Sequence, residues 1–138
     1  MNGAIKRYIT VVVKRKVIWM KTNLLAAGPA KRLTEEVLSR ITAKIVGNFQ
    51  PEKVILFGSH AWGNPRTYSD VDILVVMDVE GSLIRKEAEI SKTARPKYVP
   101  MDIIVRTPEQ IQHRLRIGDP FIHRIMKEGK VLYEQGVS

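Results

Sequence analysis

The sequence predicts a small α/β (α+β) domain in which a mixed β-sheet is flanked by helices. Three observations lead to this fold class: an amphipathic helical pattern at 31–49, short apolar runs that end at glycine, and helix-capping signals between those runs. At 138 residues the chain is about the size of one typical domain, so we expect a single hydrophobic core.

The first half of the chain predicts one helix and two buried strands. In the helix at 31–49 the apolar residues fall on one face with a period of 3.6, and they are Leu33, Val37, Leu38, Ile41, Ile45 and Val46. Two apolar runs follow, at 54–57 and 71–77, and a glycine lies shortly after each. Runs of this length between turn residues are typical of buried strands.

The second half continues the alternation of helices and strands. A helix is expected at 83–94, a strand at 99–105, two short helices after it, and an edge strand at 131–133. Each short helix begins with a capping residue followed by proline, at Thr107-Pro108 and Asp119-Pro120, and ends at a glycine. The helices are therefore expected to lie against the sheet.

The net charge of +9 is the one unusual bulk property, and it is unevenly distributed. The first 20 residues contain five lysines or arginines and no acidic residue. We interpret 1–30 as a basic N-terminal extension, either disordered or preceding a true start at Met20, and 31–138 as the domain. Such an extension could bind nucleic acid, because polyanions are the usual partners of basic segments.

Composition excludes several other classes of protein. Cysteine is absent, which excludes disulfides and thiolate metal sites and favours hard cations with oxygen ligands. No apolar run approaches the ~20 residues needed to span a bilayer. We therefore expect a soluble protein of the cytoplasm.

Gly58 and Ser59 directly follow the first predicted strand and form a candidate phosphate-binding turn. Glycine allows a sharp turn and a close approach of phosphate to the backbone. The Ser59 hydroxyl and the backbone N–H groups of the turn are donors suited to an anion. The sequence thus predicts that phosphate binds here.

Asp70 and Asp72 lie two residues apart at the start of the second predicted strand, so their side chains share one face. Their spacing along the strand is about 7 Å. Two carboxylates so placed can hold a pair of Mg²⁺ ions about 3.5–4 Å apart, which suits transfer of a phosphoryl group. We predict that both residues are metal ligands.

Asp102 is the best candidate for a third acidic residue of this site, because it interrupts the apolar strand at 99–105. A charge inside a sheet needs a partner or a metal. Beside the strand at 71–77, Asp102 could bind metal and accept a proton from an attacking hydroxyl. A salt bridge to a lysine or arginine is the alternative.

Together these residues resemble the signature of the DNA polymerase beta-like nucleotidyltransferase superfamily, and within it the minimal nucleotidyltransferases. The signature consists of Gly58-Ser59, ten intervening residues, Asp70-Val71-Asp72 and the separate acid Asp102. The resemblance runs from about Lys31 to Glu134. It implies the polymerase beta-like fold and transfer of a nucleoside monophosphate, usually AMP from ATP, to a hydroxyl.

Many small members of this superfamily resemble the antitoxin of a toxin–antitoxin pair, which adenylylates a tyrosine on a helical, HEPN-type toxin encoded nearby. The resemblance therefore implies a toxin protein as partner. An aminoglycoside-type acceptor and a non-catalytic module that binds toxin, nucleotide or RNA remain alternatives, and an oligomer is compatible with all of them.

Four other residues of the motif keep two interpretations each. His60 could touch a nucleotide, but an exposed loop histidine is the simpler interpretation. Trp62 and Tyr68 could stack on a base or pack beneath the loop. Arg66 could contact phosphate or lie in solvent. Relatives often carry arginine where this chain has Trp62, so a charge contact from that position is not expected.

Overall fold

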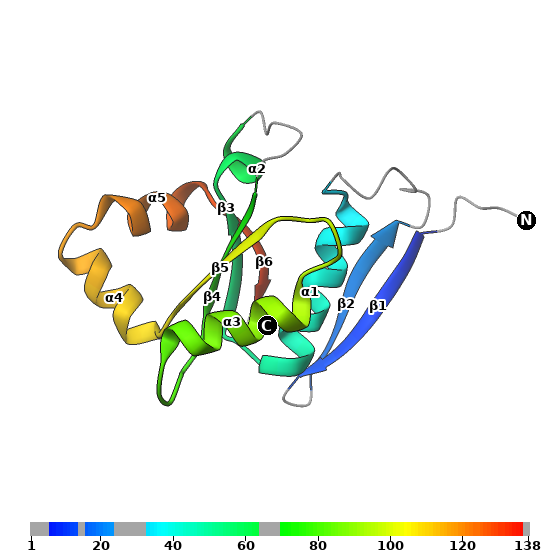
Figure 1. The fold of residues 1–138 in the computed structure, drawn as a ribbon, viewed down its shortest axis with the longest axis horizontal. Helices are drawn as coiled ribbons and strands as arrows, with labels where there is room; N and C mark the ends of the chain where they lie inside the picture. The colour runs from blue at the N-terminus through cyan, green and yellow to red at the C-terminus, as the bar shows by residue number, and fades with distance from the viewer. Residues whose placement is uncertain (1–5, 14–15, 24–32, 64–69, 137–138) are drawn as a thin grey trace, which may run out of the picture.

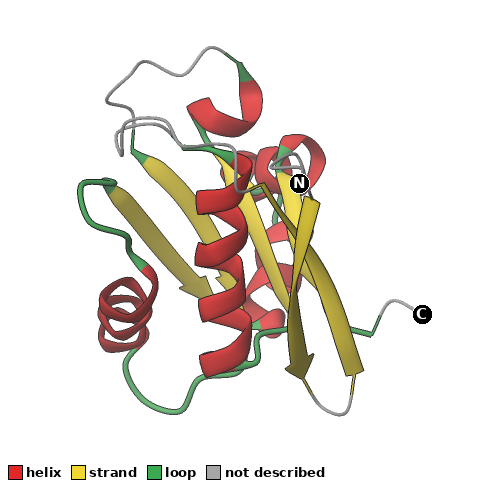
Figure 2. Ribbon diagram, turned by 90° about the vertical axis from the view of Figure 1, so that its right-hand side faces the viewer, coloured by secondary structure: helices red, strands yellow, loops and turns green. Residues whose placement is uncertain are grey.

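The chain folds around one four-stranded mixed sheet in the order β5-β4-β3-β6. A computed structural model describes residues 6–13, 16–23, 33–63 and 70–136. The central strands β3 (Lys53–Phe57) and β4 (Val71–Val76) are antiparallel. At the edges, β5 (Met101–Arg106) is parallel to β4, and β6 (Lys130–Glu134) is antiparallel to β3. Figures 1 and 2 show the sheet between two layers of helices.

Helices cover both faces of this sheet (Figure 1). The helices α1 (Glu35–Phe49) and α3 (Leu83–Ala94) lie on one face, and α4 (Pro108–Arg116) and α5 (Pro120–Glu128) lie on the other. A short helix, α2 (Ser59–Trp62), follows β3 directly. The link from β4 through α3 to β5 is long enough for a parallel pairing, which a tight hairpin could not make.

Alternation of side chains along the strands divides the core into two clusters. Val54 and Leu56 of β3 pack towards α1 and α3, whereas Ile55 and Phe57 pack towards α4 and α5. The same alternation in β4 places Ile73 in the cluster next to α1 and α3, and Leu74 in the cluster next to α4 and α5. Asp72 and Asp102 have even positions in their strands, so they lie on the α4 and α5 face.

The fold class predicted from the sequence is confirmed, with small shifts at the ends of elements. The first helix begins at Glu35, because the Thr34 hydroxyl caps it by accepting a hydrogen bond of 3.1 Å from the Val37 N–H. The capping box predicted at Thr107 is present, with Gln110 as its second member. The edge strand predicted at 131–133 is β6, beside β3.

A second, two-stranded sheet lies within the segment predicted to be an extension. Strands β1 (Lys6–Val13) and β2 (Lys16–Asn23) pair antiparallel in register, from Lys6 opposite Asn23 to Val13 opposite Lys16. Figure 1 shows this hairpin alongside α1. The sequence predicted no regular structure there, so the described part of this segment differs from the prediction of disorder. The boundary at residue 30 stays a prediction.

In the parts of the chain that the structure describes, no helix is both long and apolar enough to cross a membrane.

Candidate active site

Asp72 and Asp102 lie opposite each other on neighbouring strands. In the parallel register of β4 and β5, Val71 pairs with Met101 and Asp72 pairs with Asp102. The register continues beyond the strands through a hydrogen bond of 2.9 Å from the Val71 N–H to the Pro100 carbonyl. The condition stated from the sequence, that the third strand lies beside the second, is therefore met.

Gly58 brings the predicted phosphate-binding turn against the same carboxylate. Phe57, the last residue of β3, pairs with Asp72, and the chain leaves the strand at Gly58 with φ of +80°. A Cβ atom at residue 58 would overlap Oδ2 of Asp72 and lie 3.2 Å from its Cγ. Glycine is required here both by the positive φ and by the space that the carboxylate occupies.

The electrostatics of Asp72 reflect both its burial and the two neighbouring aspartates. Burial raises the pKa of Asp72 above its ordinary value, and the negative charges of Asp102 and Asp70 raise it further. Asp70 and Asp102 are exposed, whereas Asp72 is half-buried. An arrangement that disfavours its own negative charge is suited to bind a cation, since a cation removes the repulsion between the carboxylates.

Ser59 begins the short helix α2 directly after Gly58. The Gly58 carbonyl accepts hydrogen bonds from Ala61 and Trp62, at 3.0 and 2.9 Å, and the Ser59 carbonyl accepts one of 3.3 Å from Gly63. These bonds wind the chain into a turn whose first N–H groups point back towards the end of β3. Ser59 thus lies where its prediction as a phosphate-binding residue requires, and that role stays a prediction.

His60, which the sequence analysis interpreted as an exposed loop histidine, lies close to this site. In the structure it belongs to α2 and is half-buried. Its positive charge lowers the pKa of Asp72, so it lies within electrostatic reach of the carboxylate cluster. The expectation of an exposed loop position is therefore wrong, because the chain continues as a helix after Gly58.

Trp62, the last residue of α2, packs between Phe57 of β3 and Arg124 of α5. Its ring lies 6.3 Å from that of Phe57, and Phe57 meets Phe121 of α5 edge-on at 5.6 Å. The guanidinium of Arg124 lies 3.8 Å from the centre of the Trp62 ring. The packing interpretation of Trp62 agrees with these contacts. Arg66 and Tyr68 lie outside the described residues.

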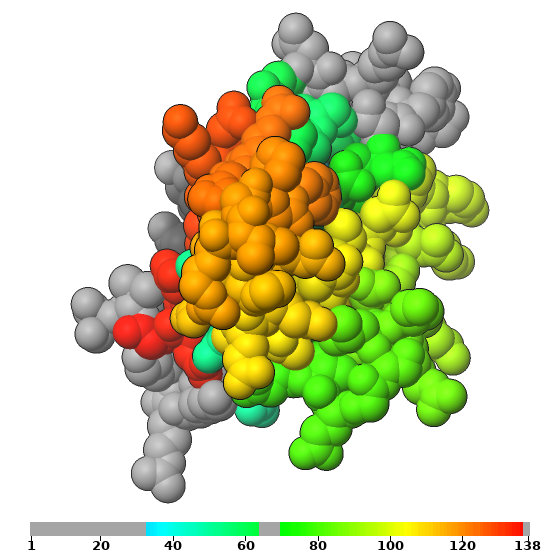
Figure 3. Space-filling view, turned by 90° about the vertical axis from the view of Figure 1, so that its left-hand side faces the viewer, coloured from blue at the N-terminus to red at the C-terminus, as the bar shows by residue number. Residues whose placement is uncertain are grey.

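Figure 3 shows the α4 and α5 face, where α5 lies beside α2. The parallel strands β4 and β5 both begin at one end of the sheet, and Asp72 and Asp102 lie at that end. The acids, the turn after β3 and α5 are therefore neighbours on one face of the molecule.

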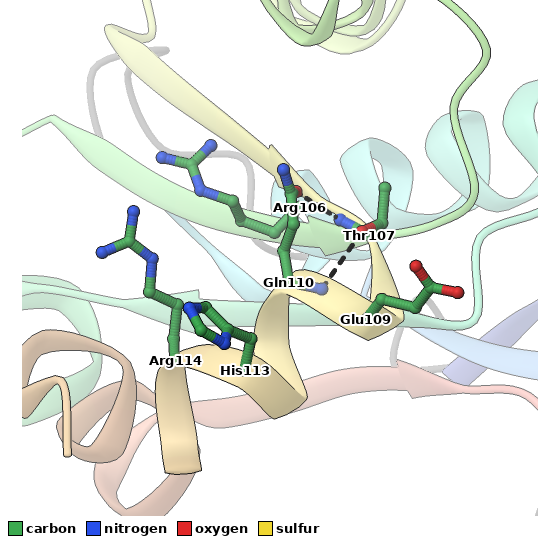
Figure 4. Close-up of a pocket in the computed structure, with 6 residues that line it drawn as sticks. All are labelled: Arg106, Thr107, Glu109, Gln110, His113 and Arg114. Carbon is green, nitrogen blue, oxygen red and sulfur yellow. Dashed lines mark hydrogen bonds between the residues drawn. The ribbon is translucent and has the colours of Figure 1, made fainter. Parts of the chain in front are cut away.

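A pocket of about 480 Å³ lies at the opposite end of β5. Figure 4 shows its lining, which is Arg106, Thr107, Glu109, Gln110, His113 and Arg114. Arg106 follows Asp102 by four residues, about 13 Å along a strand. Glu87 of α3 holds Arg106 from the other side, with its Oε2 at 3.5 Å from Nη1 and 2.8 Å from the Val105 N–H. This pocket is thus separate from the carboxylate cluster.

The donor set of the cluster fits a hard divalent cation. Asp70, Asp72 and Asp102 offer carboxylate oxygens, the ligands that Mg²⁺ prefers. Among the described residues, however, no three carboxylate or imidazole side chains already stand in metal-binding geometry. The assignment of these three residues as ligands therefore stays a prediction.

Comparison with known proteins places this arrangement in a family. Residues 39–136 match the family described as "Polymerase beta, Nucleotidyltransferase". The chain belongs to this family. The match includes Gly58, Ser59 and all three aspartates, and members of the family generally use a nucleoside triphosphate and a divalent metal. The chain is therefore a nucleotidyltransferase domain.

The chain is also similar to a protein of Methanocaldococcus jannaschii named "Putative protein adenylyltransferase MJ0604". The two are 30% identical over 104 residues, which cover 75% of this chain and 97% of that protein. The similarity thus extends over nearly the whole length of the relative.

Proposed function

We propose that this protein transfers AMP from ATP to a tyrosine hydroxyl of a partner protein, in a reaction that requires Mg²⁺. The observation that carries the proposal is the register of β4 and β5, which sets Asp72 opposite Asp102, with Gly58 packed against Asp72. Two strands, one turn and three acids thus meet at one end of the sheet. Such a site can hold both cations and phosphate.

In the proposed reaction the acceptor oxygen forms a bond to the α-phosphorus of ATP. The bond from that phosphorus to the bridging oxygen breaks, and pyrophosphate leaves. Bound Mg²⁺ would neutralise the triphosphate and the leaving pyrophosphate. Asp70 and Asp72 would hold the cations, and Asp102 would hold a cation and accept the proton of the acceptor hydroxyl. Gly58 and Ser59 would hold phosphate through backbone N–H groups and the serine hydroxyl.

A protein acceptor is favoured by one observation. The M. jannaschii relative, which is matched over 97% of its own length, is named "Putative protein adenylyltransferase MJ0604". We propose that the partner is a helical, HEPN-type toxin, that the protein is its antitoxin, and that both act in the cytoplasm, where ATP is available.

The proposal is tested with ATP labelled at the α-phosphate, Mg²⁺, and the product of the gene next to this one. We expect label on a tyrosine of that product, and loss of labelling in Asp70→Asn and Asp72→Asn. ATP labelled at the γ-phosphate is the control, because its label should leave as pyrophosphate.

The same assay separates the alternatives. Label that appears on an aminoglycoside instead of on protein would contradict the protein acceptor and keep the nucleotidyl transfer. Stable binding of the partner without transfer of label, with any nucleotide or metal, would contradict the enzymatic role.

A further inference from the structure

Arg124 is a cation that lies against α2, the helix of the predicted phosphate-binding turn. Its guanidinium stacks on the Trp62 ring at 3.8 Å, and Trp62 is the last residue of the four-residue helix α2. Ser59 is three residues earlier, about 4.5 Å along the helix axis. Arg124 therefore reaches from α5 to the same turn that begins with Gly58 and Ser59.

The orientation of Arg124 is fixed on two sides. The central carbon of the guanidinium, Cζ, lies over the Trp62 ring, an arrangement favoured by the cation–π interaction. Glu128, one turn later on α5, accepts a hydrogen bond of 2.9 Å from Nε. Of the five N–H donors of arginine, this bond uses one, and the four on the two terminal nitrogens point away from Nε.

These four donors are accessible. About half of the Arg124 side chain, 53%, is exposed, so a ligand can reach it without any movement of the core. A guanidinium that contacts a ring and a carboxylate and is half exposed can offer its remaining donors to phosphate oxygens, whose geometry it matches.

The charge of the occupied site would favour such a group. Three aspartates and a triphosphate bring many negative charges together, and divalent cations offset only part of them. On the described part of this face, Arg124 of α5 contributes a positive charge next to Trp62 of α2. A cation there would hold the end of the triphosphate that leaves as pyrophosphate.

We infer that Arg124, held by Trp62 and Glu128, binds the β- and γ-phosphates of the nucleotide. The inference rests on the proposed function, since it assumes that a nucleoside triphosphate occupies this site. It assigns a binding role to α5, and it assigns to Trp62 the role of positioning Arg124.

The test measures nucleotide binding directly. The chain has two tryptophans, Trp19 and Trp62, so Trp19→Phe leaves Trp62 as the only indole reporter. In that background, indole fluorescence is titrated with Mg²⁺ and a non-hydrolysable ATP analogue, and separately with AMP. Arg124→Met keeps a long side chain that can pack on the Trp62 ring but removes the charge. Arg116→Met, on the exposed surface of α4, is the matched control.

We expect Arg124→Met to weaken binding of the ATP analogue about tenfold or more, the usual effect of losing charge-assisted hydrogen bonds, and to leave AMP binding unchanged. Arg124→Lys should recover part of the loss, and Arg116→Met should bind both nucleotides as the parent does. The melting temperatures of the two methionine variants should be similar.

Other outcomes overturn the inference. Equal weakening for the ATP analogue and AMP, or a large fall in melting temperature with Arg124→Met, would mean that Arg124 serves only to pack α2 on α5. Unchanged binding in Arg124→Met would also overturn it while the proposed function stands. If the parent binds no nucleotide, the proposed function fails and the inference fails with it.

Discussion

The carboxylate of Asp72 lies against the Cα of Gly58, so close that a Cβ at residue 58 would overlap its Oδ2 atom. This contact joins the end of β3 to the start of β4 at the point where phosphate and metal are predicted to meet. It also makes the geometry of the site sensitive to one methyl group.

Gly58→Ala should therefore reduce nucleotidyl transfer by about a hundredfold or more, because displacement of a reacting group by an ångström has an effect of that size. Gly81→Ala is the matched control, since Gly81 also has a positive φ, +94°, but has open space around its Cα. Gly81→Ala should lose about 1–3 kcal/mol from the unfavourable backbone conformation, and Gly58→Ala should lose more because its Cβ also overlaps the Asp72 carboxylate. Denaturant unfolding and the transfer assay separate the two effects, and equal activity of the two variants would contradict the account.

Asp72→Asn should stabilise the protein at pH 7 when divalent cations are chelated, although it abolishes transfer. Because burial, Asp102 and Asp70 raise the pKa of Asp72, the ionised carboxyl is less favourable in the folded state than in the unfolded chain. The contribution of the Asp72 carboxyl to the parent's stability is complete below the ordinary aspartate pKa and is lost as pH rises through the raised pKa. The variant should thus exceed the parent in free energy of unfolding only at pH values above the ordinary aspartate pKa.

Addition of Mg²⁺ should make the parent more stable than the Asp72→Asn variant. At a concentration a hundred times its dissociation constant, a ligand stabilises the folded state by about 2.7 kcal/mol, and only the parent retains the full set of carboxylates. Thermal unfolding with and without Mg²⁺ measures both effects. An asparagine variant that is less stable than the parent at pH 7 without Mg²⁺ would show that the acids do not repel one another.

Tyr133→Phe should reduce the loss of folding stability at alkaline pH. Burial on β6 raises the pKa of the Tyr133 phenol, so ionisation favours the unfolded chain. The stability linked to this group is complete below the ordinary tyrosine pKa of about 10 and is lost as pH rises through the folded-state value. Unfolding midpoints from pH 8 to pH 11 should fall more steeply in the parent than in the variant. Parallel curves would contradict the assignment.

Gly129→Ala should destabilise the protein by several kcal/mol, because its Cβ would meet the Ile125 carbonyl and lie 2.6 Å from Cγ2 of Ile55. Here the end of α5 packs directly on β3. Gly47→Ala should instead increase the free energy of unfolding, since Gly47 lies inside α1 with nothing within 4 Å of the added atom. Alanine should stabilise that helix by about 0.5–1 kcal/mol. Comparison of the two by urea unfolding tests the packing of α5 that positions Arg124.

The sequence predicts most of the main sheet and its helices because their signals are local. Apolar runs, caps such as Thr107 and glycine stops depend on neighbours in the chain, and the same is true of Asp70 and Asp72 on one face. The meeting of Asp72 with Asp102 needed one further condition, that two strands separated by α3 are adjacent, and the parallel register supplies it.

Other features could not be predicted because they depend on packing or on weak local signals. The stacking of Arg124 on Trp62 joins residues 62 positions apart, and no periodicity relates them. The hairpin of β1 and β2 lacks the Asn-Gly or Asp-Gly turn that marks such structures, since Lys14-Arg15 stands between the strands. The helical state of His60 depends on how the chain leaves β3 at Gly58.

Asp70, Asp72 and Asp102 are predicted to hold the cations that bind ATP against Gly58 and Ser59. A crystal structure with Mg²⁺ and a non-hydrolysable ATP analogue would show the ligands of both. We expect Mg²⁺ bound by carboxylate oxygens of all three aspartates, with the triphosphate on the turn at Ser59. A nucleotide bound elsewhere, or cations that Asp72 does not touch, would overturn the assignment of these residues.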